Sequence, residues 1–332
     1  MITGGAGFLG SRLAGHLLAA NKVSIAGGLA HPLTKLTLVD LMPVPAGLAD
    51  LTADARVTAI EGSLDEVFRP GGPGLPALEG ADLVFHLAAA VSAECEADFE
   101  LGMRANVQAT QALLESCRAT GSSPVVVFAS SVAVFGQSAE HPLPAVLDDH
   151  TLPNPQSSYG TQKVICEQLL ADYTRRGFVR GRAIRLMTVC VRPGKPNAAA
   201  SGFLSAIIRE PLSGQRATCP VAPGTAVALA SPAKAIDALL CAATSADEAW
   251  GGRTPVTMPA LTVTVSEMVS ALERVAGPEV TARIDWIGDP ETARIVTSWP
   301  ASFSAERAAR LGLTADPDFE SIIRAHLAET AP

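Results

Sequence analysis

The chain has 332 residues, enough for one large domain or two moderate ones, and 48% of them are hydrophobic, so it can bury a substantial core. Its formal net charge of −8 argues against a protein that follows nucleic-acid phosphates with clustered Lys and Arg. The sequence contains neither an apolar run long enough to span a membrane nor an N-terminal basic segment followed by an apolar stretch. We therefore expect a cytoplasmic protein whose partner is a small molecule.

The first half of the sequence alternates short β-rich segments with longer helical ones. The expected strands are 36–40, 57–61, 83–87 and 125–130, and the expected helices are 8–20 and 98–120. Such alternation predicts right-handed βαβ units, and therefore an α/β fold with a doubly wound parallel sheet of the Rossmann type. Segment 125–130 is apolar on both faces, as is typical of a central parallel strand that helices cover on both sides.

The second half begins with a helix expected at 158–175 and a strand at 183–190. Later expected elements are a strand at 227–230 and helices at 203–209, 232–243, 263–275 and 305–311. The Pro- and Gly-rich composition after residue 190 indicates a change of domain. We expect a Rossmann domain at 1–190, to which segments within 225–260 return, and a smaller C-terminal substrate-binding region formed by 191–224 and 261–332.

A glycine-rich segment, Thr3-Gly4-Gly5-Ala6-Gly7-Phe8-Leu9-Gly10, leads into the first expected helix. Its Gly-x-Gly-x-x-Gly spacing matches the dinucleotide fingerprint, in which missing side chains let the backbone turn tightly and approach a pyrophosphate at the helix N-terminus. The expected cofactor contacts in this segment are Gly4, Gly7, Phe8, Leu9 and Gly10. Only residues 1–3 precede the glycines, whereas a buried strand normally has about five residues, so we expect this strand to begin upstream.

An acidic residue, Asp40, ends the second expected strand, at the position where a dinucleotide fold binds the adenosine ribose. A carboxylate there accepts hydrogen bonds from the ribose hydroxyls and repels a 2′-phosphate, and no Arg follows closely to bind one. The gap from the glycines is longer than the usual span of about 20 residues, and residues 27–32 are interpreted as an inserted loop. The sequence therefore predicts NAD rather than NADP.

Tyr159 and Lys163 are spaced by four residues within the helix expected at 158–175. On a helix this spacing places the two side chains on one face, with Cβ atoms about 5–6 Å apart. A nearby ammonium favours the phenolate, the form of the tyrosine that accepts a proton. An isolated Tyr-x-x-x-Lys pair arises by chance, but together with the glycine segment it predicts hydride chemistry on a nicotinamide cofactor.

The ordered motifs identify a family resemblance. The glycines, Asp40, His-Leu-Ala-Ala at 86–89, Asn106, Ser-Ser-Val-Ala-Val-Phe-Gly at 130–136 and the Tyr/Lys pair resemble those of the extended short-chain dehydrogenase/reductases, the NAD-dependent epimerase/dehydratase superfamily. The resemblance implies that the catalytic residues are Ser131, Tyr159 and Lys163. It also implies cofactor contacts at Leu87, Ala88, Asn106, Tyr159, Lys163 and Met187.

Departures from the motifs distinguish the sub-classes of this family. In the sugar-nucleotide 4,6-dehydratases an Asp-Glu pair follows the catalytic Ser or Thr, whereas this chain has Val132-Ala133, which cannot move protons. In the 4-epimerases the strand after the catalytic helix ends in Asn, whereas here residues 185–188 read Arg-Leu-Met-Thr. A nucleotide-sugar 4-epimerase with tightly bound NAD remains the alternative, and a non-catalytic cofactor sensor is a second, although such proteins commonly lack the Tyr/Lys pair.

Segments 90–92, 157–163 and 191–203 resemble the D-erythronate dehydrogenase group within this family. This resemblance implies NAD-dependent oxidation of a four-carbon sugar acid at its C2 hydroxyl to the 2-keto acid, in sugar acid catabolism. The predicted substrate contacts are Ser92, Ser131, Tyr159, Thr188, Arg192 and Lys195. A guanidinium or an ammonium suits the substrate carboxylate, so one of the two cations is expected to bind it, although both are equally consistent with solvated loop charges.

Assembly and metal binding are weaker predictions. Helices at 98–120 and 158–175 pair across a two-fold axis in relatives, which implies a homodimer. A stripe of Ile165, Leu169 and Tyr173 either contacts that partner or packs on the sheet. No metal site is expected, because the six cysteines include no Cys-x-x-Cys pair and the acidic and His residues at 141–150 lack ligand spacing.

Overall fold

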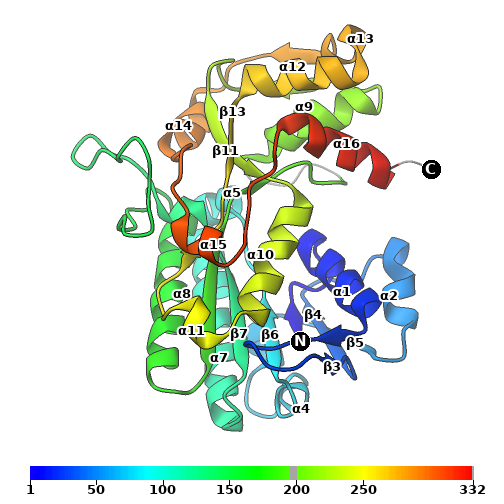
Figure 1. The fold of residues 1–332 in the computed structure, drawn as a ribbon, viewed down its shortest axis with the longest axis vertical. Coiled ribbons are helices and arrows are strands. Elements are labelled where there is room, and N and C mark those ends of the chain that lie inside the picture. The colour runs from blue at the N-terminus through cyan, green and yellow to red at the C-terminus, as the bar shows by residue number, and fades with distance from the viewer. Residues whose placement is uncertain (195–199, 331–332) are drawn as a thin grey trace.

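The computed structural model describes residues 1–194 and 200–330. Within these residues, seven strands form a parallel sheet in the order β12-β8-β7-β6-β1-β4-β5 (Figure 1). The strands are β1 Ile2–Thr3, β4 Leu36–Asp40, β5 Val57–Glu61, β6 Leu83–His86, β7 Val125–Ser131, β8 Arg180–Leu186 and β12 Val256–Thr257. The strand order reverses direction at β1, as in a doubly wound fold, so the predicted Rossmann-type α/β fold is confirmed.

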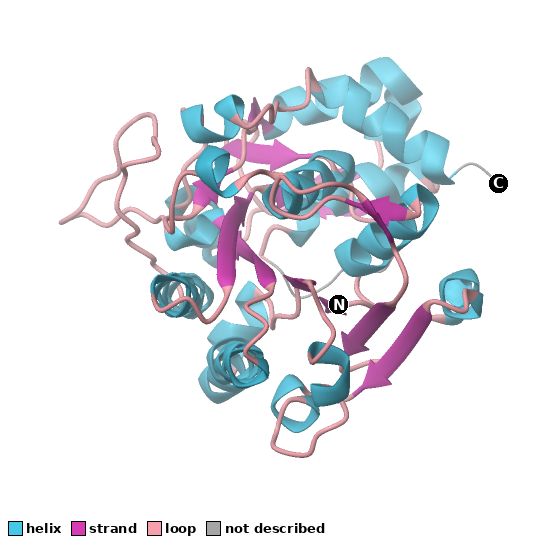
Figure 2. Ribbon diagram, turned by 60° about the horizontal axis from the view of Figure 1, so that its bottom comes forward, coloured by secondary structure: helices cyan, strands magenta, loops and turns pink. Residues whose placement is uncertain are grey.

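Helices lie on both sides of this sheet (Figure 2). The helices in chain order are α1 Phe8–Ala20, α2 Ala49–Ala53, α3 Leu64–Val67, α4 Leu75–Leu78, α5 Ser92–Ala97, α6 Phe99–Gly102, α7 Ala109–Thr120, α8 Ser158–Arg175, α9 Gly202–Leu212, α10 Pro232–Thr244, α11 Asp247–Trp250, α12 Val265–Ala276, α13 Pro278–Thr281, α14 Pro290–Ser298, α15 Glu306–Arg310 and α16 Phe319–Thr330. Successive residues of β7 face opposite ways: Val127 belongs to the same buried cluster as Leu13 of α1 and Leu239 of α10, whereas Val126 belongs to another cluster with Leu113 of α7. This double burial explains the continuous apolar sequence of β7.

A second group of elements lies above the main sheet in Figure 1. In the described part of the chain, β9 Thr188–Val189, β11 Ala226–Ala230 and β13 Leu261–Thr264 form one small sheet, and β10 Ala217–Cys219 pairs with β14 Ile284–Trp286. Helices α9, α12 and α16 cover these strands around a separate core that includes Ile207, Leu272 and Ile323. The chain returns to the main sheet through α10 and through β12, which pairs with β8.

Several element boundaries differ from the sequence prediction. The helix expected at 98–120 contains a π turn at Met103–Gln108, and the strand expected at 183–190 divides after Leu186, because Thr188 pairs with Leu229 in the small sheet. Helix α12 begins only at Val265, since residues 261–264 form β13 and Thr264 caps the helix. The loop expected at 27–32 includes β3 His31–Pro32, which pairs with β2 Lys22–Val23. Among the described helices, none is long and apolar enough to cross a membrane.

Candidate active site

The glycine-rich segment forms the turn between β1 and α1, and glycine is sterically required there. Gly4 has a φ of 72°, and a Cβ on it would lie 2.7 Å from the backbone nitrogen of Ala88. A Cβ on Gly10 would lie 2.0 Å from the carbonyl oxygen of Gly4. The turn therefore packs backbone against backbone, which leaves its outer surface open to a ligand.

The start of α1 is suited to a phosphate group. Gly7 occupies the N-cap position and has no side chain to bind the free backbone N–H groups of the first turn, which begins at Phe8 and contains no acidic residue. Asp40 lies beside the turn, because its Oδ2 accepts a hydrogen bond from the backbone N–H of Ala6 at 2.9 Å and its Oδ1 accepts one from Met42 at 3.1 Å. An uncapped helix N-terminus next to a carboxylate fits the pyrophosphate and ribose of NAD.

The predicted contacts at Leu87 and Ala88 lie directly against the glycine turn. The backbone N–H of Leu87 donates to the carbonyl oxygen of Thr3 at 3.1 Å, and that of Ala88 donates to the hydroxyl of Thr3 at 3.4 Å. Met187, another predicted cofactor contact, is buried just beyond the carboxyl end of β8. All these positions therefore lie at the carboxyl edge of the parallel sheet, where doubly wound folds bind their ligands.

The three predicted catalytic residues come from β7 and α8. Ser131 ends β7, and its hydroxyl accepts a hydrogen bond from the backbone N–H of Ala133 at 3.1 Å. Helix α8 begins where the Ser157 hydroxyl caps it, and a Cβ on Gly160 would lie 2.1 Å from the carbonyl oxygen of Ala133. The first turn of α8, which carries Tyr159, is thus packed on the turn that follows Ser131.

Lys163 lies one helical turn further along α8 and is 3% exposed. Its ammonium donates to the carbonyl oxygen of Ala129 at 2.8 Å and lies 5.5 Å from the centre of the Tyr159 ring and 4.7 Å from that of Phe128. An ammonium with so little access to water acts strongly on neighbouring groups. The geometry therefore places the Lys163 ammonium near the Tyr159 ring, while the packing of Gly160 on Ala133 holds the first turn of α8 against the turn that follows Ser131.

Arg192 is a half-buried cation three residues beyond the end of β9. Burial lowers the pKa of the Arg192 guanidinium. The guanidinium donates to the Ser201 hydroxyl at 3.1 Å, and among residues 1–194 and 200–330 no acidic side chain forms an ion pair with it. A partly buried cation of this kind is suited to an anionic ligand.

The backbone of Arg192 is held at two further points. Its N–H donates to the Ser205 hydroxyl at 3.0 Å, and its carbonyl oxygen accepts from Arg209 Nη1 at 2.6 Å. Sequence reasoning did not identify Ser201, Ser205 or Arg209, because all three belong to the segment that leads into and forms α9, where no local pattern signals a contact with residue 192.

The remaining predicted substrate contacts are only partly located. The hydroxyl of Ser92, at the start of α5, accepts a hydrogen bond from the backbone N–H of Ala200 at 3.3 Å, so it faces the segment that follows Arg192. Thr188 is half-buried in β9, just after β8. Lys195 lies outside the described residues. The roles assigned to these residues stay predictions.

Asn106 is located in the π turn and connects two sides of the site. Its Oδ1 accepts from the backbone N–H of Ala90 at 2.8 Å, and its Nδ2 donates to Gln162 Oε1 at 2.7 Å. Gln162 immediately precedes Lys163 on α8 and is 1% exposed. Sequence reasoning gave Gln162 no role, although a polar residue on the buried face of a helix is a signal that could have indicated one.

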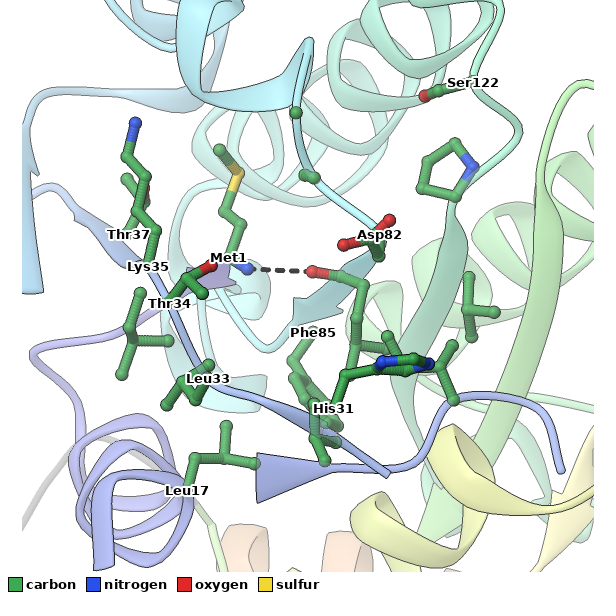
Figure 3. Close-up of a pocket in the computed structure, with 18 of the residues that line it drawn as sticks. Met1, Leu17, His31, Leu33, Thr34, Lys35, Thr37, Asp82, Phe85 and Ser122 are labelled. Atoms are coloured by element: carbon green, nitrogen blue, oxygen red, sulfur yellow. Dashed lines mark hydrogen bonds between the residues drawn. The ribbon is translucent and has the colours of Figure 1, made fainter. Parts of the chain in front are cut away.

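A cavity of about 610 Å³ lies elsewhere, at the amino-terminal ends of the central strands (Figure 3). Met1, Asp82 and Phe85 line it, and the amino group of Met1 donates to the carbonyl oxygen of Leu83 at 2.8 Å. Because the strands are parallel, this is the sheet edge opposite the glycine turn. The cavity is therefore not part of the candidate active site.

Comparison with known proteins agrees with this geometry. Residues 73–249 match the model of the NAD dependent epimerase/dehydratase family. The D-erythronate dehydrogenase of Cupriavidus necator is 50% identical over 98% of this chain and 97% of that protein, and the one of Haemophilus influenzae is 39% identical over the same shares. The crystal structure of a protein from Agrobacterium tumefaciens, named there as a nucleoside-diphosphate-sugar epimerase, is 42% identical, with a TM-score of 0.87 over 99% of this chain and 93% of that one.

These matches confirm the predicted resemblance and the prediction of NAD as cofactor, and they bear out the prediction that the protein is an enzyme. On the site and these matches together, the chain belongs to the NAD-dependent epimerase/dehydratase family.

Proposed function

We propose that this enzyme oxidises the C2 hydroxyl of D-erythronate to the 2-keto acid with NAD. Two relatives that are similar over nearly the whole chain carry the name D-erythronate dehydrogenase. The observation that carries the proposal is Arg192, a half-buried guanidinium just beyond β9 that is held by Ser201 and has no acidic partner among the described residues. A sugar acid provides the carboxylate that such a cation binds.

The catalytic roles follow from the geometry at the end of β7. The glycine turn and Asp40 would hold NAD, which would supply a hydride acceptor for the carbon that carries the hydroxyl group. Tyr159, as the phenolate, takes the hydroxyl proton onto its own oxygen, and Lys163 stabilises the phenolate and contacts the cofactor. The hydroxyl of Ser131 already accepts from Ala133, so its own proton is free to donate to the reacting oxygen.

Substrate recognition is assigned to the residues around Arg192. We assign the carboxylate to the Arg192 guanidinium, and we retain Lys195 as a second proposed cation. Ser92 and Thr188 are the proposed contacts to the other hydroxyl groups of the substrate, because Ser92 faces the segment after Arg192 and Thr188 follows the end of β8. Asp40 is the proposed contact to the adenosine ribose.

The purified protein with NAD and a panel of four- and five-carbon aldonates tests this function. NADH absorbance should rise with D-erythronate, which we expect to give the highest kcat/KM in the panel. The alternative, a nucleotide-sugar 4-epimerase, is favoured by the 42% identical Agrobacterium tumefaciens protein, which is named an epimerase. That activity would convert a nucleotide sugar to its epimer with no net NADH, so such a result without oxidation of any aldonate would reject the dehydrogenase.

Organisation and context are also proposals. We propose the nucleotide-binding domain at 1–190 with returning segments within 225–260, supported by the pairing of β12 with β8, and a substrate-binding region at 191–224 and 261–332. We further propose a cytoplasmic homodimer formed by the helical segments at 98–120 and 158–175 and acting in sugar acid catabolism. Ile165 of α8 is 36% exposed and available for such a contact. Sedimentation at several concentrations tests the dimer.

A further inference from the structure

A continuous hydrogen-bonded chain of buried polar groups runs from the glycine turn to the catalytic helix, and in it Thr110 is joined to Asn106 through the backbone carbonyl of Asn106. Its members share an exposure of 3% or less, and in spatial order they are Thr3, His86, Thr110, Asn106 and Gln162. They belong to β1, β6, α7, the π turn and α8 respectively. Thr3 directly precedes Gly4, and Gln162 directly precedes Lys163. This chain of hydrogen bonds therefore connects the glycine turn with the catalytic helix.

The hydrogen bonds of this chain determine where the protons lie. The hydroxyl of Thr110 is 2.6 Å from the carbonyl oxygen of Asn106, which can only accept, so Thr110 is the donor. The oxygen of Thr110 must then accept from His86 Nε2, 2.8 Å away. With its proton on Nε2, a neutral His86 accepts at Nδ1 from the hydroxyl of Thr3 at 2.7 Å. The imidazole thus donates at one end and accepts at the other.

The charge state of His86 agrees with this arrangement. Burial lowers the pKa of His86 to about 3, and the nearby Lys163 ammonium acts in the same direction. The ring also packs against Phe128, with 5.6 Å between ring centres. A neutral imidazole held in this way is not a proton carrier at neutral pH, so its contribution is geometric.

We propose that His86, as the Nε2-protonated tautomer, is a positioning residue that couples the dinucleotide-binding turn to the catalytic helix. Thr3, which His86 binds, also holds Leu87 and Ala88 and leads into Gly4. Thr110, on the other side, fixes the π turn from which Asn106 binds Gln162. The proposal concerns the cofactor side of the site and goes beyond the proposed function, since it does not depend on which substrate is oxidised.

The first test measures NAD binding by calorimetry for Thr110→Val, which preserves shape but breaks the chain far from the glycine turn. We expect NAD to bind about tenfold more weakly, as for loss of a buried hydrogen bond, and Thr110→Ser to restore the affinity. Thr244→Val is the matched control, because Thr244 also donates to the carbonyl oxygen four residues earlier, that of Leu240, but lies outside the chain. Unchanged NAD affinity in Thr110→Val, or an equal loss in Thr244→Val, would overturn the proposal.

The second test combines Thr110→Val with Thr3→Val. If His86 transmits the coupling, a break at one end of the hydrogen-bonded chain already removes most of the coupling. The second substitution then adds little, so the loss of NAD affinity in the double variant should be smaller than the product of the losses in the two single variants. Effects that simply multiply would show that the two ends act independently and would contradict the coupling.

The third test needs no substitution, so it does not depend on any variant folding. Nitrogen NMR shifts of 15N-labelled histidine in the unaltered protein at neutral pH report the tautomer directly. We expect His86 to be neutral with its proton on Nε2 and an accepting Nδ1. A proton on Nδ1, or a charged ring, would refute the arrangement. These outcomes are separate from those of the substrate assay, so failure of the proposed function and failure of this inference can be told apart.

Discussion

The contribution of Arg192 can be tested by replacing it with glutamine, which keeps a polar side chain of similar length but removes the charge. The guanidinium of Arg192 is partly buried, and its Nη2 atom donates to the Ser201 hydroxyl. The backbone of Arg192 is held by Ser205 and Arg209, so the side chain is already oriented before a ligand binds. A hydrogen bond to a charged group contributes about 1.5–3 kcal/mol. Since about 1.4 kcal/mol corresponds to a factor of ten, kcat/KM for D-erythronate should fall roughly 10- to 150-fold.

The assay follows NADH formation with D-erythronate and with erythritol, an uncharged four-carbon alcohol. Arg192→Gln should reduce turnover of the sugar acid but leave any slow turnover of erythritol unchanged, because only the acid has a carboxylate to lose. Arg324→Gln is the control, since that side chain is 63% exposed on α16. Equal losses with both compounds, or no loss with the acid, would show that Arg192 does not bind the carboxylate.

Three further predictions concern the catalytic and cofactor residues. Tyr159→Phe removes the proton acceptor and should lower kcat at least about 10²-fold, while NAD binding, measured by calorimetry, is retained. Normal turnover of this variant would exclude Tyr159 as the base. Gly10→Ala places a Cβ 2.0 Å from the carbonyl oxygen of Gly4 and should abolish measurable NAD binding. Gly47→Ala is the control and should bind NAD normally, because a Cβ on Gly47 would have no atom within 4 Å. Tight NAD binding by Gly10→Ala would contradict the assignment of the glycine turn to the cofactor. The folded-state pKa of His86 is about 3, below its ordinary 6.5, so the unfolded chain binds an extra proton as pH falls through this range. As the pH is lowered from 6.5, this group should therefore reduce the free energy of unfolding by up to about 1.4 kcal/mol per pH unit. Urea titrations at several pH values measure this dependence, and the same dependence on pH in His86→Gln would refute the prediction.

Local periodicity was sufficient to predict much of the nucleotide-binding half. The helix at Phe8–Ala20 and the strand at Leu36–Asp40 have the bounds that the sequence predicted, because each depends on an apolar pattern within one short segment. The close approach of Tyr159 and Lys163 was also predictable, since four residues on a helix place two side chains on one face whatever the rest of the fold does.

Features that depend on distant partners could not be predicted in this way. The π turn at Met103–Gln108 interrupts a sequence whose pattern is that of an ordinary helix. Within this turn, the buried side chain of Asn106 forms hydrogen bonds with Ala90 and Gln162, which belong to other segments of the sequence. The strand after α8 divides at Met187 because the next residues pair with β11, which comes some 40 residues later in the chain.

The sequence by itself therefore determined the fold class, the glycine turn and the Tyr159–Lys163 pair, because these follow from spacing within single segments and from the order in which strand and helix segments alternate. Only the tertiary structure decided how Arg192 is held and how His86 is protonated. Arg192 is fixed by Ser201 and other side chains from the segment that forms α9, and the direction of the hydrogen bonds at His86 depends on groups from β1 and α7. Hydrogen-bond partners on separate elements become neighbours only when the elements pack, so no pattern within one segment can reveal them.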